Sequence, residues 1–513
     1  MIRPNRPTGT SPPRMTTSAS GLIQIHVPRQ KVAPRRVLLL TAPRPRPNYT
    51  PLHFGDNRAP QGLGYVAAYL EKFGHEVKIV DLYTFTWKYR DIVREVESPW
   101  RRHKDSLSGR NWARTMEGDL KTVEGHSRGG FAQNNSDGTM EVGTDLGAEI
   151  NSFRPDFIGF YCHTMSFDTC IELAGILKRD HPDIPLMVGG PHPSVLPDTM
   201  PDFFDHIVVG EGETAVLDII EGRIHDRIVH GTRVVEMDDL PWPNLDHFWD
   251  KPYNWGLKLF GKEDLHPVIS LNTSRGCGFK CHWCGVQDVS GARFRHISAE
   301  KIFAHLIFLK EKYGIRGCYF REDNFSISMK RVMELCDLIL AHGMDLKWAC
   351  ETRVANLKPN EIEKMARAGF SGAYVGCESG SDRVLEIMKK GESTKDFLDK
   401  FPILHACGVG TYTTWIYGLP YETPADRRLT EKFQERLNPT RIDSFVFTGI
   451  PTSVLYRQII AEKGYEFMDR NGFMYQRGHL AYARALYGSD DPRTQYVTRI
   501  YAENKVTPVE KEW

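Results

Sequence analysis

The sequence contains no apolar run that approaches the roughly 18 residues of a membrane-crossing helix, so it predicts no membrane partner. It has no long basic block either, and its formal net charge is +1. Binding through phosphate neutralisation needs a basic surface, so the sequence also predicts no nucleic-acid partner. Ten cysteines among 513 residues are not a disulfide framework. Together with a loop of three closely spaced cysteines, described below, they indicate a reducing cytoplasm.

The first 35 residues lack the apolar core of a signal peptide. They are rich in Pro, Arg, Thr and Ser, a composition that cannot bury enough apolar surface to fold by itself. We therefore predict a disordered leader over residues 1–35.

The remaining chain has the composition of a soluble globular protein, with 41% hydrophobic and 26% charged residues. Its length suggests two or three domains. The pattern of elements predicts a first domain over residues 36–222, a linker over 223–264 and a second domain over 265–450. Residues 451–513 have an ambiguous helical pattern and contain no cysteine, so we expect a small helical C-terminal cap.

The first domain alternates short apolar runs with segments of helical spacing, such as residues 60–70 and 168–178. This alternation is typical of a doubly wound, Rossmann-like α/β domain with a parallel sheet. The predicted strands are residues 36–41, 77–81, 157–161, 186–190 and 207–210. Residues 90–152 are polar and rich in Gly and Asn, and form either a functional lid or a partly disordered segment.

Small and polar residues follow three of these strands, at the sheet edge where doubly wound folds bind ligands. Glycines there let a bulky cofactor approach the backbone closely, although each turn alone is a common connection between a strand and a helix. Together, in front of the second domain, they predict a cofactor site. The candidates are Thr164, Ser166, Gly189, Gly190, Pro191, His192, Gly210, Glu211 and Gly212.

The second domain repeats strand and helix units in strict order, which predicts a partial (β/α)6 barrel of the TIM type. Reactive groups of such a barrel belong on the loops at the carboxyl ends of its strands. The predicted strands are residues 268–271, 317–321, 346–351, 372–376, 410–418 and 442–447.

Three cysteines follow the first barrel strand with the spacing C-x3-C-x2-C: Cys277, Cys281 and Cys284. Three thiolates on one tight loop can hold three irons of a [4Fe-4S] cluster and leave the fourth iron open for chemistry. The alternatives are a zinc loop and incidental thiols, but zinc sites usually pair two C-x2-C units or add histidines at defined spacing. No second cysteine pair occurs here, and His282 would have to fold back to act as a ligand.

The cysteine spacing and the strand series that follows it resemble the radical S-adenosylmethionine (radical SAM) superfamily. The order of the two domains narrows this resemblance to the cobalamin-dependent radical SAM enzymes, over roughly residues 36–450. The segment from Pro60 to Tyr65 and the glycine-containing loops named above resemble the family's cobalamin-binding domain. The resemblance implies three cofactors: a [4Fe-4S] cluster, S-adenosyl-L-methionine (SAM) and cobalamin in its methylcobalamin form.

By position, the resemblance implies that the segment Glu322, Asp323 and Asn324 binds the ammonium group of SAM. A carboxylate that accepts hydrogen bonds from an ammonium makes a strong, charge-assisted contact. A helix N-cap at Asp323 or Asn324 is the alternative. The resemblance also makes Arg353 a candidate for the SAM carboxylate, with a surface salt bridge as the alternative.

Two further segments resemble SAM-contacting parts of the family. Glu378 and Ser379, after the fourth barrel strand, correspond to the ribose contact. The segment that contains Ile416 and Gly418 resembles the fifth-strand segment beside the adenine. Thr414 stands there where the family often has Gly, which weakens the adenine assignment.

One departure from many cobalamin proteins concerns the lower axial ligand of cobalt. They supply a histidine from a D-x-H-x-x-G motif, which this sequence lacks, because Asp205-His206 and Asp246-His247 have the wrong spacing. We therefore expect base-off cobalamin whose lower face is covered by side chains or water. Such a face should favour loss of the methyl group as a radical.

The resemblance implies a methyltransferase that moves a methyl group from methylcobalamin to an unactivated carbon, or a phosphinate phosphorus, of a small-molecule biosynthetic intermediate. Hydrogen abstraction by the 5′-deoxyadenosyl radical precedes the transfer, and a flavodoxin or ferredoxin supplies the electron. The short C-terminal region suggests antibiotic or other secondary metabolism. The alternatives are an oxidative cyclase or rearrangement enzyme with the same cofactors, and a cobalamin or redox sensor without turnover. The sequence reveals no general base.

Overall fold

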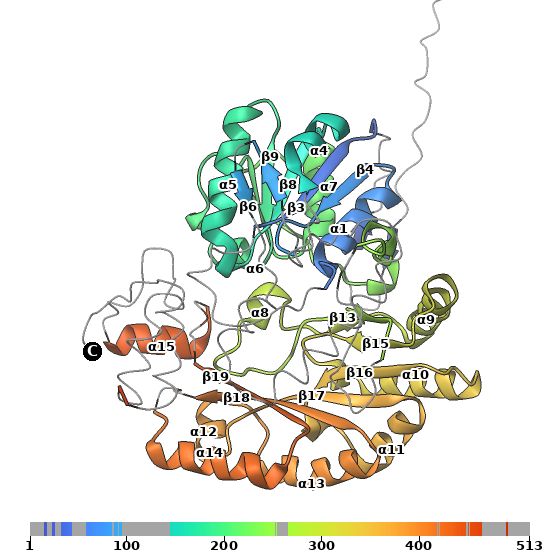
Figure 1. Cartoon of the computed structure of the whole chain (residues 1–513), viewed down its shortest axis with the longest axis vertical. Coiled ribbons are helices and arrows are strands. Elements are labelled where there is room, and N and C mark those ends of the chain that lie inside the picture. Colours follow the sequence, from blue (N-terminus) through green and yellow to red (C-terminus); the bar gives the residue numbers. More distant parts are fainter. Residues whose placement is uncertain are drawn as a thin grey trace, which may run out of the picture.

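The chain contains two six-stranded parallel sheets, each with its own helices (Figure 1). The domain built on the first sheet lies above the domain built on the second in this view. This computed structural model describes residues 15–17, 23–25, 32–43, 58–84, 87–90, 92–94, 144–251, 253, 265–417, 419, 421–447, 450, 452–463 and 489–490. Within these ranges no helix combines the length and apolar character of a membrane span.

The predicted leader and the predicted cap lie mostly outside the described residues. Inside the leader, β1 (Met15–Thr17) and β2 (Ile23–Ile25) pair as antiparallel strands, so this part differs from the predicted disorder. In the cap region the structure describes α15 (Val454–Lys463).

The N-terminal sheet has the order β11-β10-β9-β8-β3-β4, and all its pairs are parallel. From β4 to β10 this is the flavodoxin-like order 2-1-3-4-5, whose switch point lies between β3 and β8. The predicted doubly wound sheet is thus confirmed. Its strands are β3 (Arg36–Thr41), β4 (Glu76–Val80), β8 (Phe157–Tyr161), β9 (Leu186–Gly189), β10 (His206–Val209) and β11 (Ile228–His230).

Helices cover both faces of this sheet because successive side chains of a buried strand point to opposite faces. In β3, Val37 and Leu39 pack on the side of α1 and α7, whereas Leu38 and Leu40 pack on the side of α4 and α5. The helices are α1 (Gln61–Lys72), α4 (Leu146–Phe153), α5 (Phe167–Asp180), α6 (Pro191–Val195) and α7 (Gly212–Ile220).

Residues 223–264, predicted to be a linker, add β11 to the edge of the sheet, and Leu240 and Phe248 are buried in the core. A smaller three-stranded sheet has the order β6-β5-β7. Its strands are β5 (Trp87–Tyr89), β6 (Ile92–Arg94) and β7 (Thr144–Asp145). Residues 95–143, most of the polar stretch with two open interpretations, lie outside the described residues.

The C-terminal sheet has the sequential order β12-β15-β16-β17-β18-β19 with parallel pairs throughout. Because the order ends at β12 and β19, the described strands form the predicted partial barrel. Its strands are β12 (Val268–Leu271), β15 (Gly317–Phe320), β16 (Lys347–Thr352), β17 (Phe370–Glu378), β18 (Gly410–Tyr417) and β19 (Arg441–Val446).

Helices lie along the outside of this sheet (Figure 1). Outward side chains such as Trp348 and Cys350 join the main core, whereas Tyr319 donates a hydrogen bond to Glu351 at 2.9 Å on the other face. The helices are α9 (Ala299–Tyr313), α10 (Met329–Ala341), α11 (Pro359–Arg367), α12 (Asp382–Ile387), α13 (Thr394–Ala406) and α14 (Pro424–Leu437).

The two sheets meet through the segments that follow their strands. Helix α6 follows β9, and α8 (Val286–Val289) follows the cysteine loop. These two helices contact each other between the domains (Figure 1). The carboxyl ends of both sheets therefore face one interface.

Candidate functional site

The cysteine loop begins at a fixed point on the barrel. Gly276 has φ +87°, and a Cβ atom there would lie 2.3 Å from the carbonyl oxygen of Arg293, so only glycine fits. The Gly276 amide donates to Asp323 Oδ2 at 3.1 Å, and the Cys277 amide donates to the Gly291 carbonyl at 3.1 Å. The first cysteine is therefore held by backbone contacts on both sides.

The three cysteines are free thiols of intermediate exposure. Burial raises the pKa of Cys277, and it raises the pKa of Cys284 to about 11. Arg353 Nη1 donates to Cys281 Sγ at 3.5 Å, and the Val286 amide donates to Cys284 Sγ at 3.4 Å. These donors favour thiolates, the form that binds iron, and iron would displace the protons that burial retains.

The donor set fits an iron–sulfur cluster: three thiols on one loop, with a cation beside one of them. Among the described residues, these cysteines included, no three His, Cys, Asp or Glu side chains are gathered as a metal-binding group. The assignment of Cys277, Cys281 and Cys284 to the cluster therefore remains a prediction that rests on the donor set and the loop.

The residues of the acidic segment after β15 lie in different environments. Asp323 is exposed, although desolvation by the surrounding protein raises its pKa. Glu322 is instead buried, accepts from the Thr273 amide at 2.6 Å and forms an ion pair with Arg331 at 3.5 Å. Its carboxylate anchors the strand end that leads into the cysteine loop. In this structure Glu322 is committed to these partners, and the ammonium contact predicted for Glu322 stays a prediction.

Asn324 is the N-cap of the 3-10 helix Phe325–Ile327, because its Oδ1 accepts from the Ser326 amide at 3.2 Å. The alternative N-cap role is confirmed at Asn324. Its buried Nδ2 has no hydrogen-bond partner among the described residues. An amide nitrogen donates and cannot accept from an ammonium, so of this segment only Asp323 offers an available carboxylate.

Arg353 is buried, which differs from the alternative of a surface salt bridge. It is 7% exposed, contacts Cys281, and forms an ion pair with Glu392 at 3.6 Å. Its charge is thus balanced inside the protein rather than at the surface. The guanidinium lies beside the cluster loop, where the Glu392 ion pair competes with the predicted contact to the SAM carboxylate.

The two residues of the predicted ribose segment also have different surroundings. Glu378 ends β17 with φ +67° after a bulge, a strained geometry of the kind that gathers at functional sites, and burial raises its pKa. Ser379 is fully buried, and its hydroxyl pairs with Thr430 Oγ1 at 3.2 Å, so the ribose contact of Ser379 stays a prediction. Ile416 packs in one apolar cluster with Trp283 of the cysteine loop. Gly418 lies outside the described residues.

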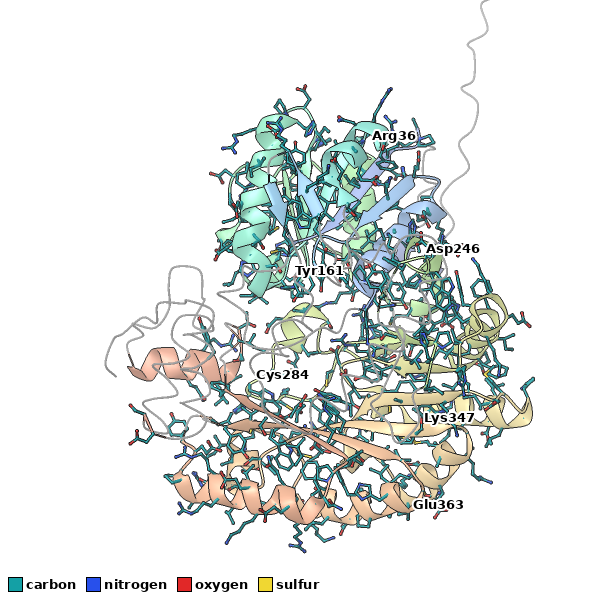
Figure 2. The ribbon with its side chains drawn as sticks, in the orientation of Figure 1. Arg36, Tyr161, Asp246, Cys284, Lys347 and Glu363 are labelled. Atoms are coloured by element: carbon teal, nitrogen blue, oxygen red, sulfur yellow. The ribbon has the colours of Figure 1, made fainter. Side chains whose placement is uncertain are left out.

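A cavity of about 250 Å³ lies at the carboxyl ends of the N-terminal sheet, and residues of the barrel domain form part of its wall. Figure 2 shows Tyr161, one of its lining residues, at the end of the upper sheet that faces the lower domain. The predicted residues on its wall are Gly189, Gly190, Pro191, Gly210, Glu211 and Gly212.

Glycine is required at this wall. Gly190 has φ +111°, and a Cβ atom there would lie 2.7 Å from the Cys162 carbonyl oxygen. Gly210 has φ +85°. A wall of bare backbone at the carboxyl ends of parallel strands admits a bulky planar ligand, so these residues fit the corrin ring of cobalamin.

Three predicted residues of this site do not line the cavity. His192 is fully buried between Thr164 Oγ1 at 3.2 Å and Thr199 Oγ1 at 2.9 Å, and burial lowers its pKa to about 4. Ser166 is also fully buried and pairs with His163 at 3.3 Å. These side chains hydrogen-bond within the domain in this structure, and the cofactor contacts predicted for Thr164, Ser166 and His192 stay predictions. None of the described residues that line the cavity is a histidine.

Glu211 lines the cavity but uses its carboxylate in ion pairs between the domains. It pairs with both Arg275, at 3.2 Å, and Arg295, and Glu213 forms a further ion pair with Arg275. Tyr65 Oη donates to the carbonyl of Asn272 at 2.5 Å beside this group. These partners were not predicted from the sequence. Arg275 stands two residues before Cys277, and this position beside the cysteine loop could have marked it as a candidate. The sequence around Arg295 contains no such indication.

Two family models match the chain in the order of its sheets. The B12 binding domain matches residues 120–220, and the radical SAM superfamily matches residues 271–433. The second match begins at the last residue of β12 and covers the cysteine loop. The first match ends with α7 and covers the glycine-containing turns.

Named relatives cover most of the chain at low identity. A Pyrococcus horikoshii protein named as an uncharacterized methyltransferase is 26% identical over 62% of this chain and 72% of its own length. The cytidylyl-2-hydroxyethylphosphonate methyltransferase of Streptomyces wedmorensis is 23% identical over 81% of this chain and 80% of its own length.

Solved structures share the fold. The radical S-adenosylmethionine methyltransferase TsrM of Kitasatospora setae, solved with tryptophan substrate and a SAM analog, has TM-score 0.56 and 18% identity over 83% of this chain and 76% of its own. The cobalamin-dependent enzyme OxsB, with aqua-cobalamin bound, has TM-score 0.61 and 13% identity over 92% and 72%. With both domains matched in this order, the chain is a cobalamin-dependent radical SAM enzyme.

Proposed function

We propose that the protein transfers a methyl group to an unactivated carbon, or to a phosphinate phosphorus, of a small-molecule substrate. The observation that carries this proposal is the shared wall of the two sites: Arg275 lines the cavity and stands two residues before Cys277. When bound, the cluster supplies the electron that splits SAM, and cobalamin supplies the methyl group. Relatives named as methyltransferases support this outcome.

Each part of the chain has a proposed task. Cys277, Cys281 and Cys284 would hold three irons of the cluster. Asp323 would accept hydrogen bonds from the SAM ammonium, since it is the exposed carboxylate of its segment. Glu378 would contact the ribose. The domain boundaries given above are part of this proposal.

The inner face of the barrel would bind the substrate. Tyr374 and Tyr412 stack there with ring centroids 4.7 Å apart, and Tyr319 donates to Glu351. Aromatic walls with a few polar groups orient small molecules and exclude water from a reacting radical. A flavodoxin or ferredoxin is the proposed electron donor.

An anaerobic reconstitution tests the function. The protein is loaded with iron, sulfide and cobalamin and reduced with dithionite. It is then given labelled SAM together with metabolites from the pathway that the neighbouring genes encode. A methyltransferase forms 5′-deoxyadenosine, S-adenosylhomocysteine and a methylated product. A cyclase, the activity named for a relative from Rubrivivax gelatinosus that is 24% identical, would form no S-adenosylhomocysteine. A sensor would leave SAM intact, and Cys284→Ala is the inactive control.

A further inference from the structure

Four charged side chains form a buried charge cluster behind the cysteine loop: Arg353, Glu378, Lys390 and Glu392. Each is at most 8% exposed. Lys390 Nζ lies 3.4 Å from Glu392 Oε2 and 3.7 Å from Glu378 Oε1, and Arg353 Nη2 lies 3.6 Å from Glu392 Oε2. Two cations thus face two carboxylates in a site that is almost closed to solvent.

The two cations of this cluster contact the cysteine loop directly. The Arg353 guanidinium lies 4.0 Å from the ring centroid of Phe279, and its Nη1 donates to Cys281 Sγ. Lys390 Nζ lies 5.6 Å from the ring centroid of Trp283. Phe279 and Trp283 stand between the three cysteines in sequence, so both cations are held against the segment that would surround the irons.

The positions of these charges are fixed by the backbone. A Cβ atom on Gly376 would lie 2.3 Å from Glu378 Oε1 and 3.4 Å from Lys390 Nζ, so the cluster fills the space beside this glycine. Glu392 Oε1 accepts from the Ala355 amide at 3.0 Å. Charges that are buried and held in place act on a neighbouring centre with little screening by salt.

We propose that Lys390 and Arg353 are positioning residues that set the reduction potential of the iron–sulfur cluster. The negative charge of Glu392 opposes their effect on this potential. The inference rests on the proposed function, because it needs the cluster on this loop. Reduction adds one electron from the external donor to a cluster held by three thiolates. Cations behind the loop stabilise this extra negative charge, and a carboxylate beside them opposes it.

The test compares two variants that change the local charge in opposite directions. Lys390→Met removes a positive charge and should disfavour reduction about tenfold, a midpoint about 59 mV more negative for one electron. Glu392→Gln removes a negative charge and should shift the midpoint by a similar amount to less negative values. Redox titration followed by EPR of the reduced cluster measures both. If the two residues had only a structural role, both substitutions would shift the midpoint potential in the same direction or leave it unchanged.

Two control variants complete the test. Lys390→Arg keeps the charge and should retain the midpoint of the wild type. Lys395→Met removes the same charge from the exposed ion pair with Asp399 on α13 and should leave the midpoint unchanged. Equal midpoints for Lys390→Met, Glu392→Gln and Lys395→Met would overturn the inference alone. A wild type that binds no four-iron cluster would instead overturn the proposed function.

Discussion

Arg275 and Glu213 form an ion pair across the interface of the two domains. Their side chains are only 15% and 3% exposed, and Glu213 lies in the first turn of α7 whereas Arg275 leads into the cysteine loop. Neighbouring Glu213 and Glu211 hold the pKa of Arg275 above its usual value against the opposing effect of burial. An ion pair therefore connects the wall of the cavity to the start of the cysteine loop.

Breaking this ion pair should destabilise the chain strongly. We expect Arg275→Gln to lower the free energy of unfolding by about 3 kcal/mol, because it leaves Glu213 buried without its partner. Urea denaturation of the full chain measures the effect. Glu386→Gln breaks the exposed pair with Lys389 and should change nothing measurable. Equal effects of the two substitutions would contradict the role of the buried pair.

Gly276 should be essential for iron binding. In Gly276→Ala the new Cβ atom would lie 2.3 Å from the Arg293 carbonyl oxygen, at a backbone angle that favours glycine, so the start of the loop must move. We expect iron uptake after anaerobic reconstitution to fall by more than half. The matched control is Gly314→Ala, which also has a positive φ of +64° but has nothing within 4 Å of the added Cβ atom. Full iron content in Gly276→Ala would refute this expectation.

The sequence predicted both sheets because buried parallel strands are apolar runs at regular spacing. The exception was β11, whose three residues, Ile228–His230, are too few to form a recognisable run. It becomes a strand because β10 offers an unpaired edge, as in the pairing of Val208 with Val229. Such an element depends on tertiary contact, which local pattern does not contain.

Spacing alone pointed to the cysteine loop, whose role as the cluster site stays a prediction, and to glycines that lie on the cavity wall. The sequence did not show that Glu322, Ser379 and His192 have partners inside the protein, because a polar residue after a strand can point either to a ligand or to a neighbouring loop. Only the fold distinguishes these directions. It missed Lys390 and Glu392 because their partner Arg353 is brought to them by folding of the barrel.

The cobalt of bound cobalamin should carry no histidine of this chain. Among the described residues, the cavity wall contains no histidine, and both ring nitrogens of His192 face threonine hydroxyls. We expect the EPR spectrum of the protein with cob(II)alamin to lack the splitting from a coordinating histidine nitrogen. His192→Asn should leave this spectrum unchanged while it lowers the melting temperature. Histidine splitting in the wild type that disappears in His192→Asn would show that the chain rearranges to ligate cobalt.

Glu351 should make stability depend on pH near neutrality. Burial raises its pKa to about 7 from 4.5, against the opposing effects of Arg321 and the Tyr319 hydrogen bond. A folded carboxyl that holds its proton more tightly than the unfolded one loses stability as pH rises from about 4.5 to about 7. Glu351→Gln has no proton to lose, so its stability relative to the wild type should rise over this window and level off above it.

Urea denaturation of the cluster-free chain at several pH values between 5 and 8 measures this difference. Glu363→Gln, on the exposed side of α11, is the matched control and should follow the wild type at every pH. A neutral Glu351 can donate a hydrogen bond into the barrel, and an ionised one can only accept. If Glu351→Gln and the wild type keep a constant difference across this range, the carboxyl is already ionised at pH 5, and the inner face of the barrel holds a fixed negative charge.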